Sequence, residues 1–460
     1  MIRIFGHYLR RETLLKMLLD GGLLLLVMAG IDIVQKRAQG AAFSMVSIYG
    51  LSLTASLLMF NYASGLYQPS ASQSLSHSCA RAALALLIGL PLAYGVLRVL
   101  TLGMNQEAPM LPAAMTGVAA VILHRVYANH VSGASRPHSR VMIFGSGAAA
   151  DLVTRTLAAP GLHAEIVGYF PGPNEGPPMV PPQLMLSGQG SLRDWAEKLK
   201  ADEIVVALTE RRGGSMPLRD LLDCKVSGIR VSDTQTHFEK TLGQIRIDYV
   251  NAGWLVFGDG FNRGMYPMVV KRIFDVLGAL VLLTLAAPLM LATICLIALE
   301  SKGSIFYRQE RIGQHGKSFR VLKFRSMRTD AEPDGKPRWA SADDDRTTRV
   351  GRFIRTYRID EIPQLLNVFK GEMSLVGPRP ERSFFVEQLA REVPYYSVRH
   401  SVKPGITGWA QIKYQYGATL KDSIEKLQFD LYYVKNSTLF LDLVILFQTI
   451  AVVVSGKGAR

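Results

Sequence analysis

Long apolar segments constrain this chain more than any other feature of its sequence. Four of them lie in the N-terminal part, at roughly 17–34, 41–60, 82–102 and 110–128. Each approaches the ~20 residues that a helix needs to cross a bilayer. Hydrophobic residues make up 48% of the chain and charged residues 19%, which is typical of a membrane protein with sizeable soluble parts. No small-residue cleavage site follows the first segment, so we expect a membrane helix there rather than a removed signal.

The cations that flank these segments predict their orientation. With the N-terminus in the cytoplasm, most of the flanking Lys and Arg residues are cytoplasmic (Arg3, Arg10, Arg11, Lys16, Arg81, Arg125, Arg136 and Arg140) and only Lys36, Arg37 and Arg98 lie outside. The positive-inside rule favours this arrangement. We therefore predict a four-helix transmembrane bundle over 1–131, with the N-terminus in the cytoplasm.

The chain is basic, with a formal net charge of +15, and most of the excess lies from Lys271 onward. That part contains no recognisable nucleic-acid-binding motif, so we expect anionic lipid headgroups and phosphate substrates as partners and no nucleic acid. The three cysteines, Cys79, Cys224 and Cys295, lack the spacing of a metal site. We expect them to be small buried residues in a reducing compartment.

A Rossmann-like α/β domain is predicted over 132–265. Buried strands are expected at 140–144, 165–170, 203–208 and 228–231, and a helix at 148–157. A Gly-x-Gly-x-x-Ala pattern begins at Gly145, but this pattern is weak alone, and no carboxylate follows the second strand to bind a ribose hydroxyl. The sequence therefore favours a structural or regulatory domain over a dinucleotide-binding one.

A further apolar segment, 273–299, precedes the C-terminal part of the chain. By length it could cross the membrane. Lys271 and Arg272 precede it and other cations follow it, so the positive-inside rule places both ends in the cytoplasm. Pro288 removes a backbone hydrogen bond in mid-segment and bends a helix. We predict a re-entrant helix over 271–299 that enters one leaflet and returns, with an ordinary fifth span as the alternative.

Two adjacent carboxylates, Asp360 and Glu361, follow a row of arginines and precede Pro363. Proline suits the first turn of a helix because its missing N–H would be unpaired there anyway. A helix N-terminus favours negative charge, so we expect Asp360 to have a depressed pKa, to be ionised, and to act as a nucleophile or hold a metal ion. The alternative is a capping aspartate beside a solvated glutamate.

Cationic side chains accompany this carboxylate pair in the sequence. Lys323 and Arg325 lie two residues apart on a predicted strand, 319–327, and should share one face. Arg379 stands between two prolines, on a stiff backbone that suits a guanidinium for binding a phosphate oxygen. Arginines also recur at every third position up to Arg358, a pattern that is ordinarily a solvated helix face. The candidate phosphate ligands are Lys323, Arg325, Arg358 and Arg379.

Four strings in the C-terminal part are distinctive: IFYRQERIG (305–313), FRVLKFRSM (319–327), GEMSLVGPRPE (371–381) and KPGITGWAQ (403–411). With the segment around Asp360, they resemble the bacterial sugar transferase family, the monotopic phosphoglycosyl transferases, over roughly 271–455. The four spans and the Rossmann-like domain are similar to the long-form polyprenyl-phosphate hexose-1-phosphate transferases. The first eight residues are similar to the branch associated with exopolysaccharide and PEP-CTERM loci.

The resemblance implies a mainly α catalytic domain over 266–460 that moves a hexose-1-phosphate from a UDP-sugar to undecaprenyl phosphate and releases UMP. Asp360 matches the family's nucleophile, which forms a phosphosugar-aspartyl intermediate, and Glu361 matches the residue that holds Mg²⁺. Lys323, Arg325 and Arg379 match motif positions that hold phosphates. One departure is Ala287 before Pro288, where the family often has serine, so no serine hydroxyl is present to bond the carbonyl that the proline leaves free.

Two other functions remain open on the sequence. One is a membrane glycosyltransferase that forms a glycosidic bond and releases UDP. The other is a non-catalytic membrane scaffold or redox sensor built on the Rossmann-like domain. The spans and that domain offer surface for a homodimer, and the apolar tail, 439–454, is expected as a helix at the membrane surface, with a last span as its alternative.

Overall fold

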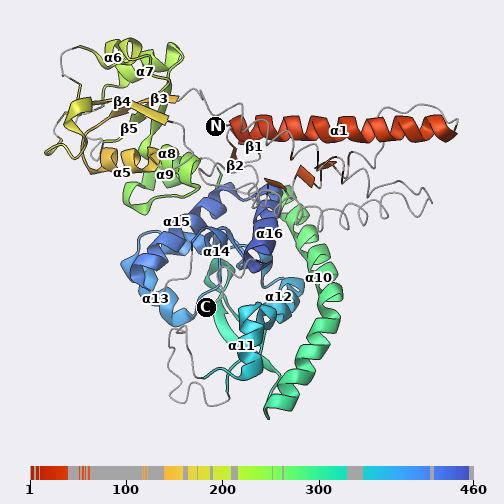
Figure 1. The fold of residues 1–460 in the computed structure, drawn as a ribbon. Coiled ribbons are helices and arrows are strands. Elements are labelled where there is room, and N and C mark those ends of the chain that lie inside the picture. The colour runs from red at the N-terminus through yellow and green to blue at the C-terminus, as the bar shows by residue number, and fades with distance from the viewer. Residues whose placement is uncertain are drawn as a thin grey trace. The chain divides into compact units, whose positions relative to one another are not determined.

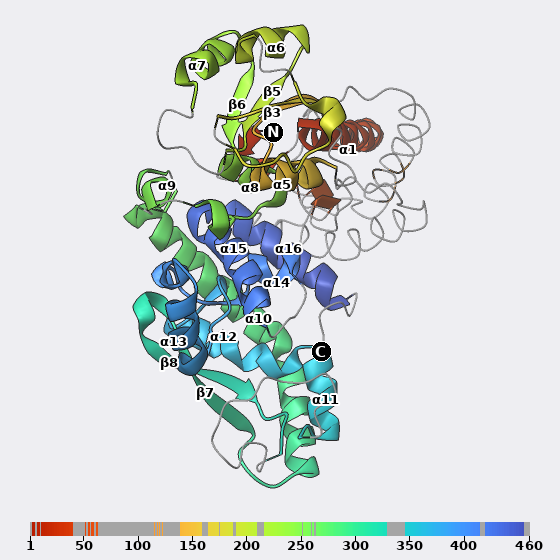
Figure 2. The same cartoon turned by 90° about the vertical axis from the view of Figure 1, so that its left-hand side faces the viewer.

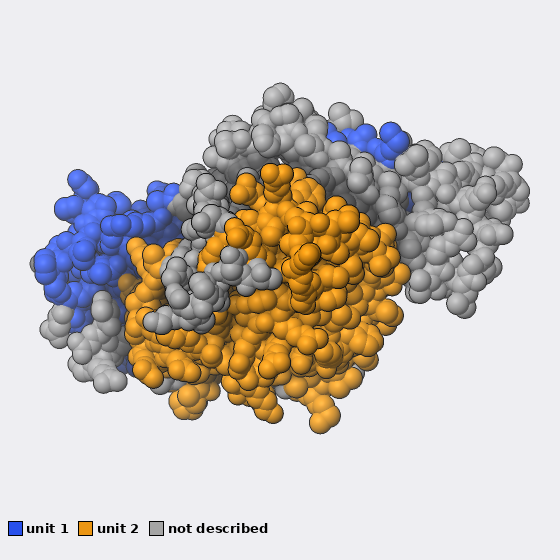
Figure 3. All heavy atoms as spheres, turned by 90° about the horizontal axis from the view of Figure 1, so that it is seen from below, with its two compact units in different colours: residues 1–2, 8–243 blue, residues 3–7, 244–460 orange. Residues whose placement is uncertain are grey.

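The computed structural model describes residues 2–4, 7–9 and 11–39, some positions in 51–62 and 115–122, and 139–454 apart from gaps at 159–163, 174, 187–189, 209–215, 251, 259, 262–263, 329–345 and 415–418. The chain divides into two compact units. One consists of Met1–Ile2 with Tyr8–Gly243, and the other of Arg3–His7 with Gln244–Arg460, as Figure 3 shows in two colours.

A long helix dominates the described N-terminal residues. Strands β1 (Ile2–Ile4) and β2 (His7–Leu9) pair with each other, and helix α1 (Arg11–Gln39) follows. The first predicted membrane segment lies within α1, whose stretch Thr13–Ile31 is apolar enough to cross a membrane. Of the other three predicted segments, 82–102 lies wholly and the other two lie mostly outside the described residues. The four-helix bundle therefore stays a prediction.

The α/β domain has a four-stranded parallel sheet in the order β4-β3-β5-β6, with β3 at Ser139–Phe144, β4 at Ala164–Phe170, β5 at Glu203–Val206 and β6 at Arg230–Asp233. All four predicted strands are confirmed. The last begins two residues later than predicted, since Gly228, at φ 92°, still belongs to the turn after the preceding helix. Chain order changes direction between β3 and β5, which is the switch point of a doubly wound sheet.

Helices cover both faces of this sheet (Figure 1). On one face α5 (Ala148–Leu157) contacts α8 (Thr234–Leu242), and on the other α6 (Leu192–Lys198) contacts α7 (Leu218–Val226), while the short helix η1 (Pro182–Leu184) follows β4. Met142, Phe144 and Ile204 are fully buried beneath α6 and α7. Alternating strands and helices with apolar sheet faces thus produce the three-layer domain that the sequence predicted.

The second unit is mainly helical. Its helices are η2 (Ile247–Tyr249), α9 (Ala252–Phe257), α10 (Met265–Glu300), η3 (Gln314–Gly316), α11 (Arg349–Thr356), η4 (Ile359–Gln364), α12 (Leu365–Lys370), α13 (Ser383–Glu392), η5 (Tyr396–Ser401), α14 (Trp409–Lys413), α15 (Leu420–Asn436) and α16 (Leu439–Val454). Strands β7 (Phe306–Ile312) and β8 (Ser318–Phe324) form an antiparallel hairpin (Figure 2), and β9 (Ser374–Val376) pairs in parallel with β10 (Gly405–Thr407).

Helix α10 is one continuous helix of 36 residues, about 54 Å long at 1.5 Å per residue, and it bends along its length (Figure 1). Pro288 lies inside it. One side is buried at Ala279 and Ile297, whereas many large apolar side chains, such as Leu285, are exposed. Cys295 is exposed as well, so the expectation of a buried cysteine was wrong at this position. Its segment Pro267–Glu300 is the second described stretch long and apolar enough to cross a membrane. The re-entrant path itself stays a prediction.

Candidate active site

The Asp360–Glu361 pair lies in η4, a 3₁₀ helix that leads into α12. Arg358 precedes it in a left-handed conformation, at φ 59°. A non-glycine residue rarely adopts this conformation, and here it turns the chain sharply between α11 and η4. Pro363 follows within η4, as the helix start at this pair predicted. The two carboxylates therefore occupy the first turn of a short helix, and both side chains are buried, each about 7% exposed.

Three cations converge on Glu361. Lys323 Nζ lies 3.0 Å from its Oε1, Arg379 Nη2 lies 2.7 Å from the same atom, and Arg358 Nη1 lies 3.7 Å away. Burial alone would raise the pKa of Glu361, but Arg379, Lys323 and Arg358 lower it well below its ordinary value. The carboxylate is therefore ionised and holds the cationic side chains in one place.

Asp360 behaves differently from its neighbour. Among the described residues its carboxylate has no ion pair or side-chain hydrogen bond, and burial together with the charge of Glu361 raises its pKa to about 6. The expectation of a depressed pKa at Asp360 was wrong. The N–H groups at a helix N-terminus favour the ionised form, but desolvation outweighs them at Asp360, and it is Glu361 that forms ion pairs with the cations.

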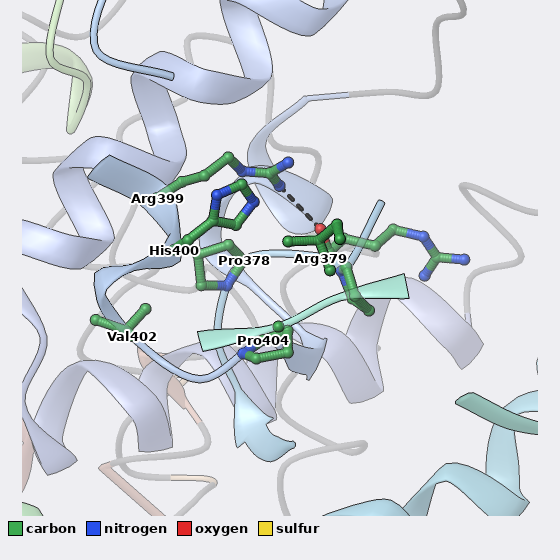
Figure 4. A pocket seen from close by; sticks show the side chains of 9 residues that line it. Pro378, Arg379, Arg399, His400, Val402 and Pro404 are labelled. Atoms are coloured by element: carbon green, nitrogen blue, oxygen red, sulfur yellow. Dashed lines mark hydrogen bonds between the residues drawn. The ribbon is translucent and has the colours of Figure 1, made fainter. Parts of the chain in front are cut away.

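The main chain and the side chain of Arg379, in the Pro-Arg-Pro segment, make contacts in different places. Figure 4 shows the side chain extending away from a small pocket that Pro378 and Pro404 help to line, while its carbonyl oxygen accepts a hydrogen bond from Arg399 Nη2 at 2.8 Å. The guanidinium reaches both oxygens of Glu361, at 2.7 and 3.5 Å. The structure thus brings the predicted residue Arg379 to the carboxylate pair.

Arg325 does not join this cluster. Strand β8 ends at Phe324, so Arg325 no longer follows the alternation that would place it beside Lys323. Its guanidinium donates instead to the carbonyl oxygens of Ser301 (2.7 Å) and Lys302 (3.2 Å), and to Ser301 Oγ at 2.9 Å. These groups follow the C-terminus of α10, where a cation satisfies unpaired carbonyls. The expected shared face of Lys323 and Arg325 was therefore wrong.

The arginine row belongs mostly to α11. Among the described contacts of this row, Arg358 is the member that reaches the carboxylate pair. The N-terminus of α11 is capped by Thr348, whose hydroxyl accepts from Gly351 N, and by Glu300, whose carboxylate accepts from the N–H groups of Arg349 and Val350. The C-terminal end of α10 is thereby tied to the helix that leads into the candidate active site.

The residues expected at the membrane hairpin tie the other end of α10 to the same unit. Lys271 Nζ lies 3.0 Å from Asp275 Oδ1 and 2.9 Å from Asp442 Oδ2 on α16. Arg272 donates to the carbonyl oxygens of Val368 (2.7 Å) and Phe369 (2.8 Å), in the last turn of α12. Both ends of α10 are therefore fastened to the unit that contains Asp360.

The glycine turn of the α/β domain is occupied by a side chain of the same domain. Glu175 Oε2 accepts hydrogen bonds from Ser146 N (2.7 Å), Ser146 Oγ (2.9 Å) and Gly172 N (3.1 Å). In a dinucleotide-binding fold, an anionic phosphate approaches the backbone N–H groups of this turn. A carboxylate already lies there, which favours the structural or regulatory interpretation of this domain.

The carboxylates of Asp360 and Glu361 are the candidate donors for a magnesium ion. The described residues contain no group of three or more His, Cys, Asp or Glu side chains arranged to hold a metal ion. Mg²⁺, however, is commonly held by one or two carboxylates together with substrate phosphates. Asp360 is unpaired among the described residues, and Glu361 Oε2 has only the 3.5 Å contact to Arg379. The pair therefore offers the carboxylate oxygens that a magnesium ion bound together with a phosphate group would use.

Comparisons with known proteins define the family. The bacterial sugar transferase family matches residues 266–456. The UDP-N-acetylgalactosamine-undecaprenyl-phosphate N-acetylgalactosaminephosphotransferase of Aeromonas hydrophila is 44% identical over 242 residues, which are 53% of this chain and 56% of that protein. The UDP-glucose:undecaprenyl-phosphate glucose-1-phosphate transferase of Escherichia coli (strain K12) is 33% identical over 325 residues, 67% of this chain and 66% of that protein.

An uncharacterised sugar transferase of Bacillus subtilis (strain 168), EpsL, is 41% identical over 193 residues, which cover 42% of this chain and 91% of that protein. The chain therefore belongs to the bacterial sugar transferase family. Its match spans about half of the Aeromonas relative and about two thirds of the Escherichia relative. The matched region includes the whole candidate site described above.

Proposed function

We propose that this protein transfers a hexose-1-phosphate from a UDP-sugar to undecaprenyl phosphate and releases UMP. The observation that carries the proposal is the buried Asp360, whose carboxylate has no described ion-pair partner, beside a Glu361 that holds Lys323, Arg358 and Arg379 together. A nucleophile and a cationic cluster are what phosphoryl transfer to a carboxylate requires. The names of the relatives support the same reaction.

In the proposed first step, an Asp360 oxygen attacks the phosphorus that carries the sugar. A bond forms between this oxygen and the phosphorus, the diphosphate anhydride bond breaks, and UMP leaves with the bond's electron pair. In the second step, a phosphate oxygen of undecaprenyl phosphate attacks the same phosphorus and Asp360 departs as a carboxylate. The two steps together replace the diphosphate linkage of the UDP-sugar by a diphosphate linkage to the lipid.

The cationic cluster would bind the diphosphate. Lys323, Arg358 and Arg379 carry three positive charges beside the carboxylates of Asp360 and Glu361, and the phosphates of the substrate would bind to these cations. Arg379 offers a planar fork that matches phosphate oxygens. Glu361 would hold Mg²⁺ as the substrate binds, and the ion would supply charge neutralisation on the transferring phosphoryl group. Lys323 and the two arginines orient the substrate.

The proposed location is the cytoplasmic side of the inner membrane, with α10 as a re-entrant helix. Both ends of α10 are fastened to the catalytic unit, at Arg272 and at Glu300, and its other face exposes apolar side chains. A helix that crossed the bilayer fully would have to carry one of these attachments to the opposite side. Initiation of an exopolysaccharide or capsule repeat on the lipid carrier is the pathway step we propose.

The covalent mechanism is tested by trapping. Purified protein is incubated with UDP-sugar and Mg²⁺ without lipid acceptor, and a phosphosugar adduct on Asp360 is expected by mass spectrometry. Asp360→Asn serves as the control without adduct. An enzyme that turns over fully but never yields the adduct would contradict the two-step mechanism.

The released nucleotide separates the proposed reaction from its rival. A phosphoglycosyl transferase releases UMP, whereas a glycosyltransferase that forms a glycosidic bond releases UDP. A panel of UDP-sugars that includes UDP-glucose and UDP-N-acetylgalactosamine, the sugars in the relatives' names, would identify the substrate by UMP release. A non-catalytic scaffold predicts neither product, and predicts that Asp360→Asn leaves the protein's role in the cell intact.

The path of α10 is tested by single cysteines near Lys271 and Lys302, introduced after removal of the three natural cysteines. A re-entrant helix predicts that a membrane-impermeant thiol reagent labels both positions from the same side. Labelling from opposite sides would establish an ordinary span instead.

A further inference from the structure

Arg399 is a buried arginine that the sequence analysis did not single out. It lies in η5 and is 6% exposed. Desolvation opposes its charge, yet Tyr396, Asp430 and Glu381 around it raise its pKa further above its ordinary value. A buried guanidinium is costly unless it is paired and hydrogen-bonded, so its contacts indicate what it does.

Its guanidinium connects three elements. Nη2 lies 2.8 Å from Asp430 Oδ2 on α15 and donates to the carbonyl oxygen of Arg379, also at 2.8 Å (Figure 4). Nη1 donates to Tyr396 Oη at 2.8 Å. Asp430 is 2% exposed and lies on a long helix, so it is a fixed anchor. Arg399 thereby attaches the backbone at residue 379 to α15.

The orientation of the Arg379 carbonyl affects the orientation of the Arg379 side chain. Pro380 follows it, and the residue before a proline has restricted backbone angles. Fixing the carbonyl therefore also fixes the direction in which the Arg379 side chain leaves the backbone. That side chain ends 2.7 Å from Glu361 Oε1, within the cationic cluster. A small rotation at residue 379 would be amplified along the side chain and would withdraw the guanidinium.

We propose that Arg399 is a positioning residue, which acts through the Arg379 main chain to aim the Arg379 guanidinium at the phosphate-binding cluster. The inference rests on the proposed function, since it assigns Arg379 to substrate phosphate. Arg399 itself is buried, with two of its nitrogens committed to protein partners, and it does not touch the substrate. Asp430 anchors it, which explains a carboxylate buried at this position of α15.

Arg399→Lys tests the proposal because lysine keeps the charge but has a single donor head. It can satisfy Asp430 but cannot also hold the Arg379 carbonyl with the same planar fork. We expect the KM for UDP-sugar to rise about 10-fold, as the loss of one charge-assisted hydrogen bond predicts, with a smaller change in kcat. Arg391→Lys, at an exposed site on α13 of the same unit, is the matched control and leaves KM unchanged.

A double-mutant cycle with Arg379→Ala separates positioning from a general structural role. If Arg399 acts through Arg379, then Arg399→Lys changes KM less than about 2-fold once the Arg379 side chain is gone. A full additional 10-fold loss in that background would overturn the proposal, as would an unchanged KM in the single variant. Thermal unfolding of each variant in the cycle confirms that only folded proteins are compared.

Two further provisions keep the result decisive. If Arg399→Lys fails to fold, the same cycle is run with Asp430→Asn, which keeps the guanidinium and weakens its anchor. The same non-additivity is expected, and additive losses again overturn the proposal. Failure of the proposed function is visible separately, because the wild-type protein would then release no UMP, whereas failure of the positioning role leaves wild-type activity intact.

Discussion

Replacing Asp360 by asparagine should stabilise the fold while it abolishes transfer. Burial and the charge of Glu361 raise the pKa of Asp360 from 3.8 to about 6. Between these values the folded state binds more protons than the unfolded state, so stability falls as the pH rises through this window. A raise of about 2 pKa units corresponds to about 3 kcal/mol of destabilisation at pH 7.5, which asparagine would remove. The carboxylate has no described ion pair that the substitution would break.

The expected gain depends on pH in a way that a simple packing effect would not. At pH 7.5 the Tm of Asp360→Asn should exceed that of the wild type by about 5–10 °C, given the entropy of unfolding of a domain of this size. At pH 4.5 Asp360 is largely protonated when folded, so the gain should shrink to about 1 kcal/mol. Thermal unfolding of the detergent-solubilised protein at the two pH values measures both.

Glu361→Gln is the matched control, because the pKa of Glu361 is lowered whereas that of Asp360 is raised, and the expected change in stability therefore has the opposite sign. The cations Arg379, Lys323 and Arg358 lower the pKa of Glu361 despite its burial, so its ionised form contributes stability that is present above its unfolded pKa. Glutamine should therefore lower the Tm at pH 7.5. Equal Tm values for wild type and Asp360→Asn at pH 7.5, or a pH-independent gain, would refute the reasoning about burial at this site.

Three further outcomes are expected. The rate of the first transfer step should fall below about pH 6, because Asp360 becomes protonated there. In Glu361→Gln this fall should move to lower pH, because the neighbouring negative charge is gone. Pre-steady-state UMP release at several pH values measures both effects. Arg325→Ala should lower the free energy of unfolding by about 2–3 kcal/mol, because it removes the hydrogen bonds to the residues after α10. It should leave the KM for UDP-sugar unchanged, whereas Lys323→Ala should raise this KM. Melting curves and steady-state kinetics distinguish the two variants. NAD should not raise the Tm of the wild-type protein, since Glu175 occupies the glycine turn; a rise would show that this carboxylate gives way to a dinucleotide.

Local patterns predicted the α/β domain well. Helix α5 has the predicted bounds, and β3 and β4 begin within a residue of theirs. Apolar runs separated by glycine turns carry this information along the chain itself. What they could not show is that Glu175, almost thirty residues beyond Ser146, returns to that turn and accepts its hydrogen bonds.

At the candidate active site, the sequence identified the residues better than their environments. Lys323, Arg358 and Arg379 do meet at Glu361. The expected low pKa of Asp360 was wrong because burial depends on elements far away in sequence. Arg325 was misplaced because the strand ends one residue before it, and Arg399 was missed because its partners, Arg379 and Asp430, lie 20 and 31 positions away.

The sequence by itself determined that this chain has segments apolar enough to cross a membrane, that an α/β domain precedes its mainly helical C-terminal part, and that a carboxylate pair is accompanied by cationic side chains. Hydrophobic periodicity and residue type are local properties, and they suffice for those conclusions. Only the tertiary structure decided which of the two carboxylates pairs with the cations. Desolvation and ion pairing depend on distances between residues 323, 360, 361 and 379, and these distances exist only once the chain is folded.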